Sequence, residues 1–225
     1  MTALLTIENL PDLNETITVP EDIFEELTAQ DASVAGFNPY EQPTVRDLLY
    51  GVLLPSGADA CETLARAVGG SEEGFVAMMN QKAEELGLTN THFENCTGLH
   101  NDNHYSTCRD IAVLMSECLK SDTFREIVTR EVYTTEATAS HPEGIMLYDT
   151  MLHRFTSYEM STTLENGAVI EGGKTGFTDE AGQCLVSFAE YGGEEYILVT
   201  AEAMTDSGSA VDSIADASTV YGRLQ

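Results

Sequence analysis

One lysine in this chain stands in a glycine-rich stretch, EGGKTGFTDEAGQCLVSF at residues 171–188, that could bind an anion. The chain has only three lysines and a formal net charge of −28, so Lys174 is a rare cation among many acids. An anionic ligand of such a protein must find a local positive charge. Lys174 is therefore the first candidate for a residue that binds a phosphate or a carboxylate.

A phosphate-binding P-loop is the first possibility for this stretch. That motif needs a further glycine five residues before Gly173, where the chain has Ala168, and it must lead directly into a helix. Here the following residues alternate as strands do, over 183–190 and 195–202, with a Tyr-Gly-Gly turn between them. The pattern predicts instead that residues 174–176 open the first strand of a hairpin.

A Lys-Thr-Gly triplet on a strand edge suits the terminal carboxylate of a peptide. Lys174 supplies charge, the Thr175 hydroxyl donates a hydrogen bond, and Gly176 lets a ligand lie against the backbone. In the penicillin-interacting serine enzymes this triplet accompanies two other motifs, S-x-x-K and S-x-N. The stretch LLPSGADA, residues 53–60, offers Ser56 as the serine of S-x-N, although its proline and glycine also fit a plain helix–helix turn.

Composition limits the class of protein. The 225 residues, 42% of them hydrophobic, suffice for one globular domain. Ten basic against 38 acidic residues argue against nucleic-acid partners and anionic membrane surfaces. No apolar run is long enough to span a membrane, and no export signal opens the chain. Membrane contact is expected only if a tail beyond residue 225 provides it.

The cysteines and histidines of this chain are candidate metal ligands. Five cysteines, an odd number without a C-x-x-C pair, predict at least one thiol without a partner in the chain. Cys96, His100, His104 and Cys108 recur every four residues, a spacing that would make a zinc-binding face on a continuous helix. The residues between them have loop composition, so we expect an ordinary loop and neither a metal nor a cofactor.

The chain reads as a set of helices followed by strands. Residues 16–42 are expected to be irregular, with a short strand at TITV, residues 16–19, and residues from 132 onward to be strand-like and rich in turns. A helix without a preceding capping residue is predicted over 1–9. Further helices are predicted from capping residues and apolar spacing over 44–54, 59–68, 72–86, 107–120, 122–129 and 209–223.

Residues 1–9, 44–115 and 171–189 carry a resemblance to a known family. The chain resembles the serine D-alanyl-D-alanine carboxypeptidases, the low-molecular-mass penicillin-binding proteins of bacterial cell walls. The resemblance implies an α+β fold of the penicillin-binding protein or β-lactamase-like transpeptidase type, missing its N-terminal part. It implies one domain over 1–225, with a helical part at about 40–130 and an antiparallel sheet part at about 131–225. It also implies removal of the terminal D-alanine from peptidoglycan stem peptides through an acyl-enzyme, outside the membrane.

The resemblance assigns roles to residues of this sequence. Ser56 matches the serine that relays protons near the nucleophile, and Lys174 matches the lysine that positions the substrate carboxylate and polarises that serine. Thr175 matches the hydroxyl that binds the carboxylate, Gly176 completes the triplet, and the backbone N–H of Phe177 matches an oxyanion-hole donor. The implied partners are pentapeptides ending in D-Ala-D-Ala and the β-lactams that mimic them. This mechanism predicts that Ser56 and Lys174 lie within a few ångströms of each other in one cleft.

Two departures from the family pattern bear on activity. Ala58 stands at the third position of S-x-N, so the amide that would contact the substrate is missing. No S-x-x-K is present, because the residues three positions before Lys82, Lys120 and Lys174 are Met79, Glu117 and Glu171. We therefore expect a truncated carboxypeptidase that is inactive alone. The alternatives are a non-catalytic peptidoglycan-binding relative and, with less support, a β-lactamase-like hydrolase.

Overall fold

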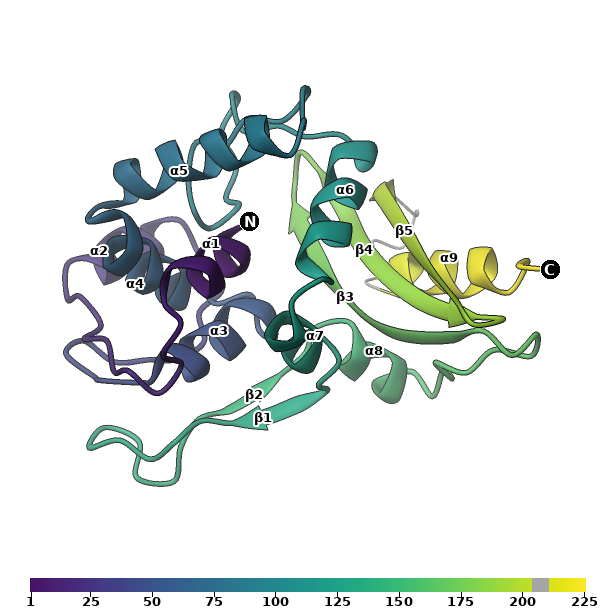
Figure 1. The fold of residues 1–225 in the computed structure, drawn as a ribbon. Helices are drawn as coiled ribbons and strands as arrows, with labels where there is room; N and C mark the ends of the chain where they lie inside the picture. Colours follow the sequence, from purple (N-terminus) through teal and green to yellow (C-terminus); the bar gives the residue numbers. More distant parts are fainter. Residues whose placement is uncertain (204–210) are drawn as a thin grey trace.

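A computed structural model gives the fold and describes residues 1–203 and 211–225. Helices gather on one side of the molecule, and an antiparallel sheet with two further helices forms the other side (Figure 1). The first group comprises α1 (Thr2–Asn9), α2 (Ile23–Ala29), α3 (Val45–Leu53), α4 (Ala58–Gly69), α5 (Glu72–Glu85), α6 (Cys108–Cys118) and α7 (Asp122–Val128). The remainder comprises β1 (Val132–Thr134), β2 (Met146–Tyr148), α8 (Leu152–Ser157), β3 (Val169–Thr178), β4 (Gly182–Tyr191), β5 (Glu194–Ala203) and α9 (Asp212–Tyr221).

Side-chain caps explain where several helices begin. At α3 the Thr44 hydroxyl accepts a hydrogen bond from the Asp47 amide, and the Asp47 carboxylate accepts one from the Thr44 amide, which forms a complete capping box. Ser71 caps α5 and Thr107 caps α6 in the same position. Helix α4 ends at Gly70, whose φ of +76° is left-handed. The helices predicted over 44–129 are thus confirmed to within two residues, and α1 begins, as expected, without a side-chain cap.

The sheet has the order β3-β4-β5, with both pairs antiparallel. The strands predicted over 183–190 and 195–202 are confirmed as β4 and β5. Residues 174–176 lie, as predicted, on the first strand of a hairpin, with Lys174 opposite Val186 of β4, but this strand, β3, begins at Val169 and not at Lys174. Strand propensity alone does not predict the start of β3, because this part of the strand contains Gly172 and Gly173 and glycine is a poor strand former.

Tight packing explains those two glycines. A Cβ on Gly172 would lie 2.4 Å from the carbonyl oxygen of Val128, and a Cβ on Gly173 would lie 2.4 Å from the carbonyl oxygen of Val186. No side chain fits at either position without moving backbone. The strand that carries Lys174 can therefore approach α7 and β4 closely.

Two predictions of irregular or strand-like structure were wrong. Residues 16–42 include α2, and the segment after β2 includes α8, while TITV forms only an isolated bridge between Thr16 and Thr44. Helices α2 and α8 span seven and six residues, too few turns to give a visible helical period. Of the helix predicted over 209–223, residues 209 and 210 lie outside the described residues, and α9 (Asp212–Tyr221) confirms the rest to within two residues.

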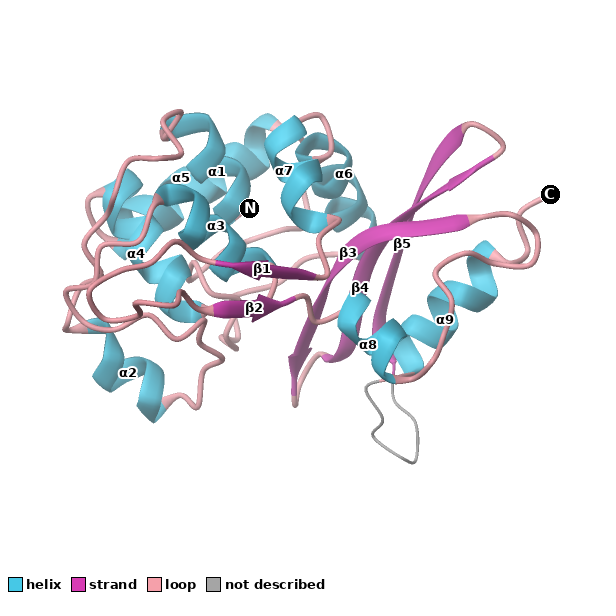
Figure 2. Ribbon diagram, turned by 90° about the horizontal axis from the view of Figure 1, so that it is seen from below, coloured by secondary structure: helices cyan, strands magenta, loops and turns pink. Residues whose placement is uncertain are grey.

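Two groups of buried apolar side chains hold the elements together. Phe188 of β4 is fully buried in the larger group, among residues of the helices, and so it ties the sheet to them. Both views show the helices α1–α5 on one side of the sheet and α8 and α9 on the other (Figures 1 and 2). The smaller group lies between the sheet and α8 and α9 and includes Met151, Phe155, Ile170, Ile214 and Tyr221. The interpretation of the chain as one domain with two parts stays a prediction.

Candidate active site

Ser56 lies in the short connection between α3 and α4. Its φ is +64°, a left-handed conformation that costs a residue other than glycine about 1 to 3 kcal/mol. The next residue, Gly57, has no room for a side chain, because a Cβ there would lie 2.7 Å from the Cβ and the backbone nitrogen of Ala35. The Asp59 carboxylate accepts hydrogen bonds from the amides of residues 35–37 and so fixes that segment against the start of α4. Dense packing around this connection holds Ser56 in its strained conformation.

Lys174 reaches from β3 to Ser56. Its Nζ donates to Ser56 Oγ at 2.9 Å and to the carbonyl oxygen of Thr175 at 2.9 Å. The predicted contact between residues 118 positions apart is confirmed. Burial lowers the pKa of Lys174 from its ordinary value of 10.5 to about 8, and the negative charge of Asp149 opposes that fall. At pH 7 the side chain is therefore still mainly an ammonium ion.

A cavity of about 290 Å³ lies beside this contact, and we call it the cleft. Its lining includes the predicted site residues Ser56, Ala58, Lys174, Thr175, Gly176 and Phe177. Among the described residues that line it, Lys174 is the only charged one. A Cβ on Gly176 would meet only Cys184 Cβ at 3.7 Å, so there is room above this strand. The Ala58 methyl group is 4% exposed and offers the cleft no polar atom.

Two further polar residues support Lys174 and Thr175, and sequence reasoning missed both. Thr150 Oγ1 lies 2.6 Å from Thr175 Oγ1. The neighbouring Asp149 is 1% exposed, and its Oδ1 accepts hydrogen bonds from the amides of Met151 and Leu152. Its Oδ2 is buried without a hydrogen-bond partner in the described structure, and burial raises the pKa of Asp149 to about 6. No spacing in the sequence links Asp149 and Thr150 to Lys174, which lies 25 and 24 positions later.

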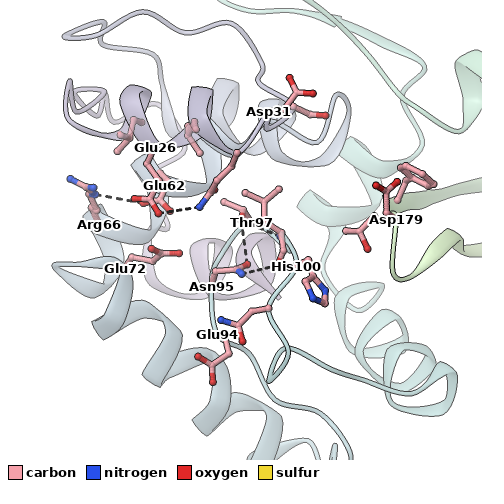
Figure 3. Close-up of a pocket in the computed structure, with 18 residues that line it drawn as sticks. Glu26, Asp31, Glu62, Arg66, Glu72, Glu94, Asn95, Thr97, His100 and Asp179 are labelled. Atoms are coloured by element: carbon pink, nitrogen blue, oxygen red, sulfur yellow. Dashed lines mark hydrogen bonds and ion pairs between the residues drawn. The ribbon is translucent and has the colours of Figure 1, made fainter.

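The cleft adjoins a larger cavity of about 710 Å³, with which it shares Thr97, Leu99, Phe177 and Thr178 among other lining residues. Figure 3 shows Glu62, Glu72 and Arg66 on one side of this cavity and Asp179 on the other. Carboxylates outnumber basic groups on its walls. We call it the acidic cavity. Its acids are Glu26, Asp31, Glu62, Glu72, Glu94 and Asp179.

The four-residue series of cysteines and histidines does not converge on one point. Cys96 is buried, whereas Cys108 is exposed at the first residue of α6. His104 Nδ1 accepts a hydrogen bond from the Glu94 amide, and His100 lies 3.4 Å from Asp102. Within the described residues, the one group of such side chains that lies close enough together to hold a metal ion is Glu62, Glu72 and Cys96.

Comparison with solved structures gives the class of protein that this fold and site define. The chain is similar to the crystal structure of the Streptomyces K15 DD-transpeptidase, with a TM-score of 0.78 and 30% identity over 98% of this chain and 85% of that one. It is also similar to the D-alanyl-D-alanine carboxypeptidase of Mycobacterium tuberculosis H37Rv, with a TM-score of 0.77 and 26% identity. The latter match covers 98% of this chain and 78% of the other. The fold is therefore the α+β fold of the penicillin-binding DD-peptidases.

Sequence comparison identifies the family. Residues 1–205 match the family model described as D-alanyl-D-alanine carboxypeptidase, and the chain belongs to that family. It is 34% identical over 206 residues to the D-alanyl-D-alanine carboxypeptidase DacF of Bacillus subtilis (strain 168), a match that covers 91% of this chain. It is 36% identical over 192 residues to the D-alanyl-D-alanine carboxypeptidase of Streptomyces sp. (strain K15), covering 83% of this chain. The chain spans 50% and 64% of the length of these two relatives.

Proposed function

We propose that this chain forms the substrate-binding face of a serine-type D-alanyl-D-alanine carboxypeptidase. Its substrates are peptidoglycan stem peptides that end in D-Ala-D-Ala, and β-lactams bind as mimics of them. The observation that carries the proposal is the 2.9 Å contact between Lys174 Nζ and Ser56 Oγ at the cleft. An ammonium beside a hydroxyl suits both a terminal carboxylate and a proton relay.

Each residue of the triplet has a separate task in this proposal. Lys174 attracts the substrate carboxylate and polarises Ser56, which passes a proton near the reacting carbonyl. Thr175 donates its hydroxyl hydrogen to the carboxylate, while Thr150 holds that hydroxyl in place through the 2.6 Å contact. Gly176 leaves room for the peptide backbone, and the N–H of Phe177 donates to the developing oxyanion.

Acylation needs a serine nucleophile with a base beside it, and the sequence motif that provides this pair is missing from these 225 residues. A serine hydroxyl is a weak nucleophile near neutral pH unless a base lies beside it, and in S-x-x-K that base is the lysine one helical turn later. No S-x-x-K is present in the sequence, and in this proposal Lys174 serves the substrate carboxylate and Ser56. We expect the chain by itself to bind D-Ala-D-Ala peptides without cleaving them. A non-catalytic peptidoglycan-binding relative is the second candidate, and the same missing motif favours it.

The proposed substrate implies a location outside the cytoplasmic membrane, at the cell wall. The chain's similarity to D-alanyl-D-alanine carboxypeptidases supports that location. None of the helices in the described part of the chain has the length and apolar character needed to cross a bilayer.

Peptide binding tests recognition directly. A short acetylated peptide ending in D-Ala-D-Ala should bind to the chain more tightly than the same peptide with a C-terminal amide, measured by calorimetry or NMR titration. Lys174→Met should remove this preference, a loss of about tenfold or more, because the charge-assisted bond to the carboxylate disappears. Lys120→Met is a matched control on an exposed lysine paired with Glu117. Equal binding of acid and amide by the parent chain would refute the proposal.

Labelling with a fluorescent penicillin tests the chemistry. Intact-mass spectrometry should show no penicilloyl adduct on this chain. A chimera that joins a helical segment carrying S-x-x-K to its N-terminus should label. An adduct on Ser56 of the short chain would overturn the assignment of Ser56 as a relay. A folded chimera that binds the peptide acid and still does not label would favour the non-catalytic relative.

A further inference from the structure

Three potential metal ligands converge beside the cleft from three separate segments. Glu62 lies on α4, Glu72 is the first residue of α5, and Cys96 lies in the loop between α5 and α6. One donor atom from each residue lies within 4.8 Å of the other two. Cys96 Sγ is 3.4 Å from Glu62 Oε1, and the Cys96 amide donates to Glu72 Oε1 at 3.2 Å. This cluster has no part in the function proposed above.

The cluster is mostly shielded from water. Glu62 is 8% exposed, Cys96 is 4% exposed, and Glu72 is half-buried. The two carboxylates repel each other, because their oxygens lie within 4.8 Å of each other and little water screens them. Arg66 Nε lies 3.6 Å from Glu62 Oε2, but the Nη1 of the same guanidinium is bound to Asp22. Arg66 therefore does not fully offset the negative charge of Glu62 and Glu72. A proton shared between the two carboxylates, or a bound cation, must complete the charge balance.

We propose that Glu62, Glu72 and Cys96 bind a zinc-type divalent cation. A thiolate with two carboxylates suits zinc or cadmium and does not suit magnesium or calcium, which take oxygen ligands. In a tetrahedral site the donors lie about 3.5 Å apart, so the three groups need to close by only about 1 Å. Binding breaks the S–H bond of Cys96, releases its proton to solvent and forms a sulfur–metal bond.

The surroundings complete such a site. Three anionic ligands around a divalent ion leave one net negative charge, and Arg66 already faces Glu62 from outside the cluster. Glu62 and Glu72 both line the acidic cavity (Figure 3), so a water molecule from this cavity can take the fourth ligand position.

A cation here would stiffen one wall of the cleft. Thr97 and Gly98 follow Cys96 directly and line the cleft together with Ser56 and Lys174. The metal would tie their loop to α4, the helix that begins two residues after Ser56. Its role is therefore structural: it sets the position of the loop that faces the Lys174 strand.

Metal binding to the purified chain tests this proposal. After treatment with a chelator, the chain is titrated with Zn²⁺ and Cd²⁺ in a large excess of Mg²⁺, followed by elemental analysis and by the ultraviolet sulfur-to-cadmium absorption. We expect one ion per chain and a higher Tm with Zn²⁺. Cys96→Ser and Glu72→Gln should each weaken binding by about 100-fold or more. Cys118→Ser removes another buried thiol, and Glu94→Gln removes another acid of the same cavity, and both should bind as the parent does.

The variants separate a built site from general attraction of cations to acids. If Glu72→Gln and Glu94→Gln lose the same amount of Zn²⁺ affinity, or if Mg²⁺ displaces the bound ion, the cations are attracted only by the general negative charge of the cavity. Either result would overturn the proposal. Absence of binding to the folded parent would leave a shared proton between Glu62 and Glu72 and would also overturn it. If Cys96→Ser fails to fold, the Glu72→Gln variant still tests the site, because Glu72 is half-buried and its replacement disturbs the fold less. Cadmium absorption in the parent that is lost in Glu72→Gln would then show that the cluster binds the ion.

Discussion

Replacing Lys174 by methionine measures what it costs this fold to keep a cation at the cleft. Methionine has a similar length and no charge. Burial lowers the pKa of Lys174 from 10.5 to about 8, which corresponds to about 3 kcal/mol of unfavourable free energy for the ammonium form. Because Lys174 borders the cleft, water relieves part of this cost, and we expect about 2 kcal/mol to be measurable.

The sign of the pH dependence follows from the direction of the shift. Between pH 8 and 10.5 the unfolded chain binds more protons at this lysine than the folded chain does, so stability rises with pH in that window. The full cost is present below pH 8. The free energy of unfolding of the parent, relative to Lys174→Met, should therefore increase by about 2 kcal/mol from pH 7 to pH 10. Urea denaturation of both chains at each pH measures it, and the titration of tyrosines and cysteines cancels in the difference.

Lys82 provides the matched control. Its hydrogen bond and ion pair with Glu8, together with its ion pair to Glu85, raise its pKa, the opposite direction. Lys82→Met should therefore show no relative gain for the parent between pH 7 and pH 10. Parallel pH profiles for the parent and Lys174→Met would mean that the Lys174 ammonium is as well solvated as in the unfolded chain, and the reasoning would fail.

Five further substitutions, in three comparisons, test the packing and charge around the cleft. From pH 4 to pH 7 the free energy of unfolding of Asp149→Asn should rise by about 2 kcal/mol relative to that of the parent, measured by denaturant titration. The reason is that the raised pKa of Asp149 makes the parent less stable as the pH rises toward 6. A difference that does not change with pH would contradict this. Gly172→Ala should lose about 3 kcal/mol or more, whereas Gly176→Ala should stay within about 0.5 kcal/mol, and similar losses at both would refute the steric reading. Ser56→Gly should be more stable than Ser56→Ala by about 1 kcal/mol in thermal unfolding, because only glycine relieves the φ of +64°; equal stabilities would show that this position is unstrained.

Local chemistry made much of the helical part predictable. The capping box of Thr44 and Asp47 and the caps at Ser71 and Thr107 are signals carried within four residues of chain, and each marks a helix start in the structure. The hairpin of β4 and β5 was equally visible, since alternating strands flank a turn with two glycines of positive φ. These elements depend on hydrogen bonds and steric contacts between residues close together in the chain, so they can be predicted directly from the sequence.

Other elements gave no local signal because packing between distant segments decides them. Helices α2 and α8 are too short to show a period, and β3 begins with glycines that propensity argues against. Gly172 and Gly173 belong in that strand because the carbonyl oxygens of Val128 and Val186 leave no room for a Cβ, which no sequence window of a few residues can reveal.

The candidate site divides in the same way. The sequence by itself determined the family pattern, the triplet at Lys174, the serine at Ser56, the alanine at Ala58 and the absence of S-x-x-K. The resemblance also predicted that Ser56 and Lys174 meet, but only the tertiary structure shows what brings them together across 118 positions: β4 docks on the helices through Phe188. The tertiary structure alone brought the Asp149 carboxylate close enough to Lys174 to act on its charge. The pKa values, the strain at Ser56 and the cluster of Glu62, Glu72 and Cys96 are likewise products of burial, which is a property of the packed chain and of no single segment.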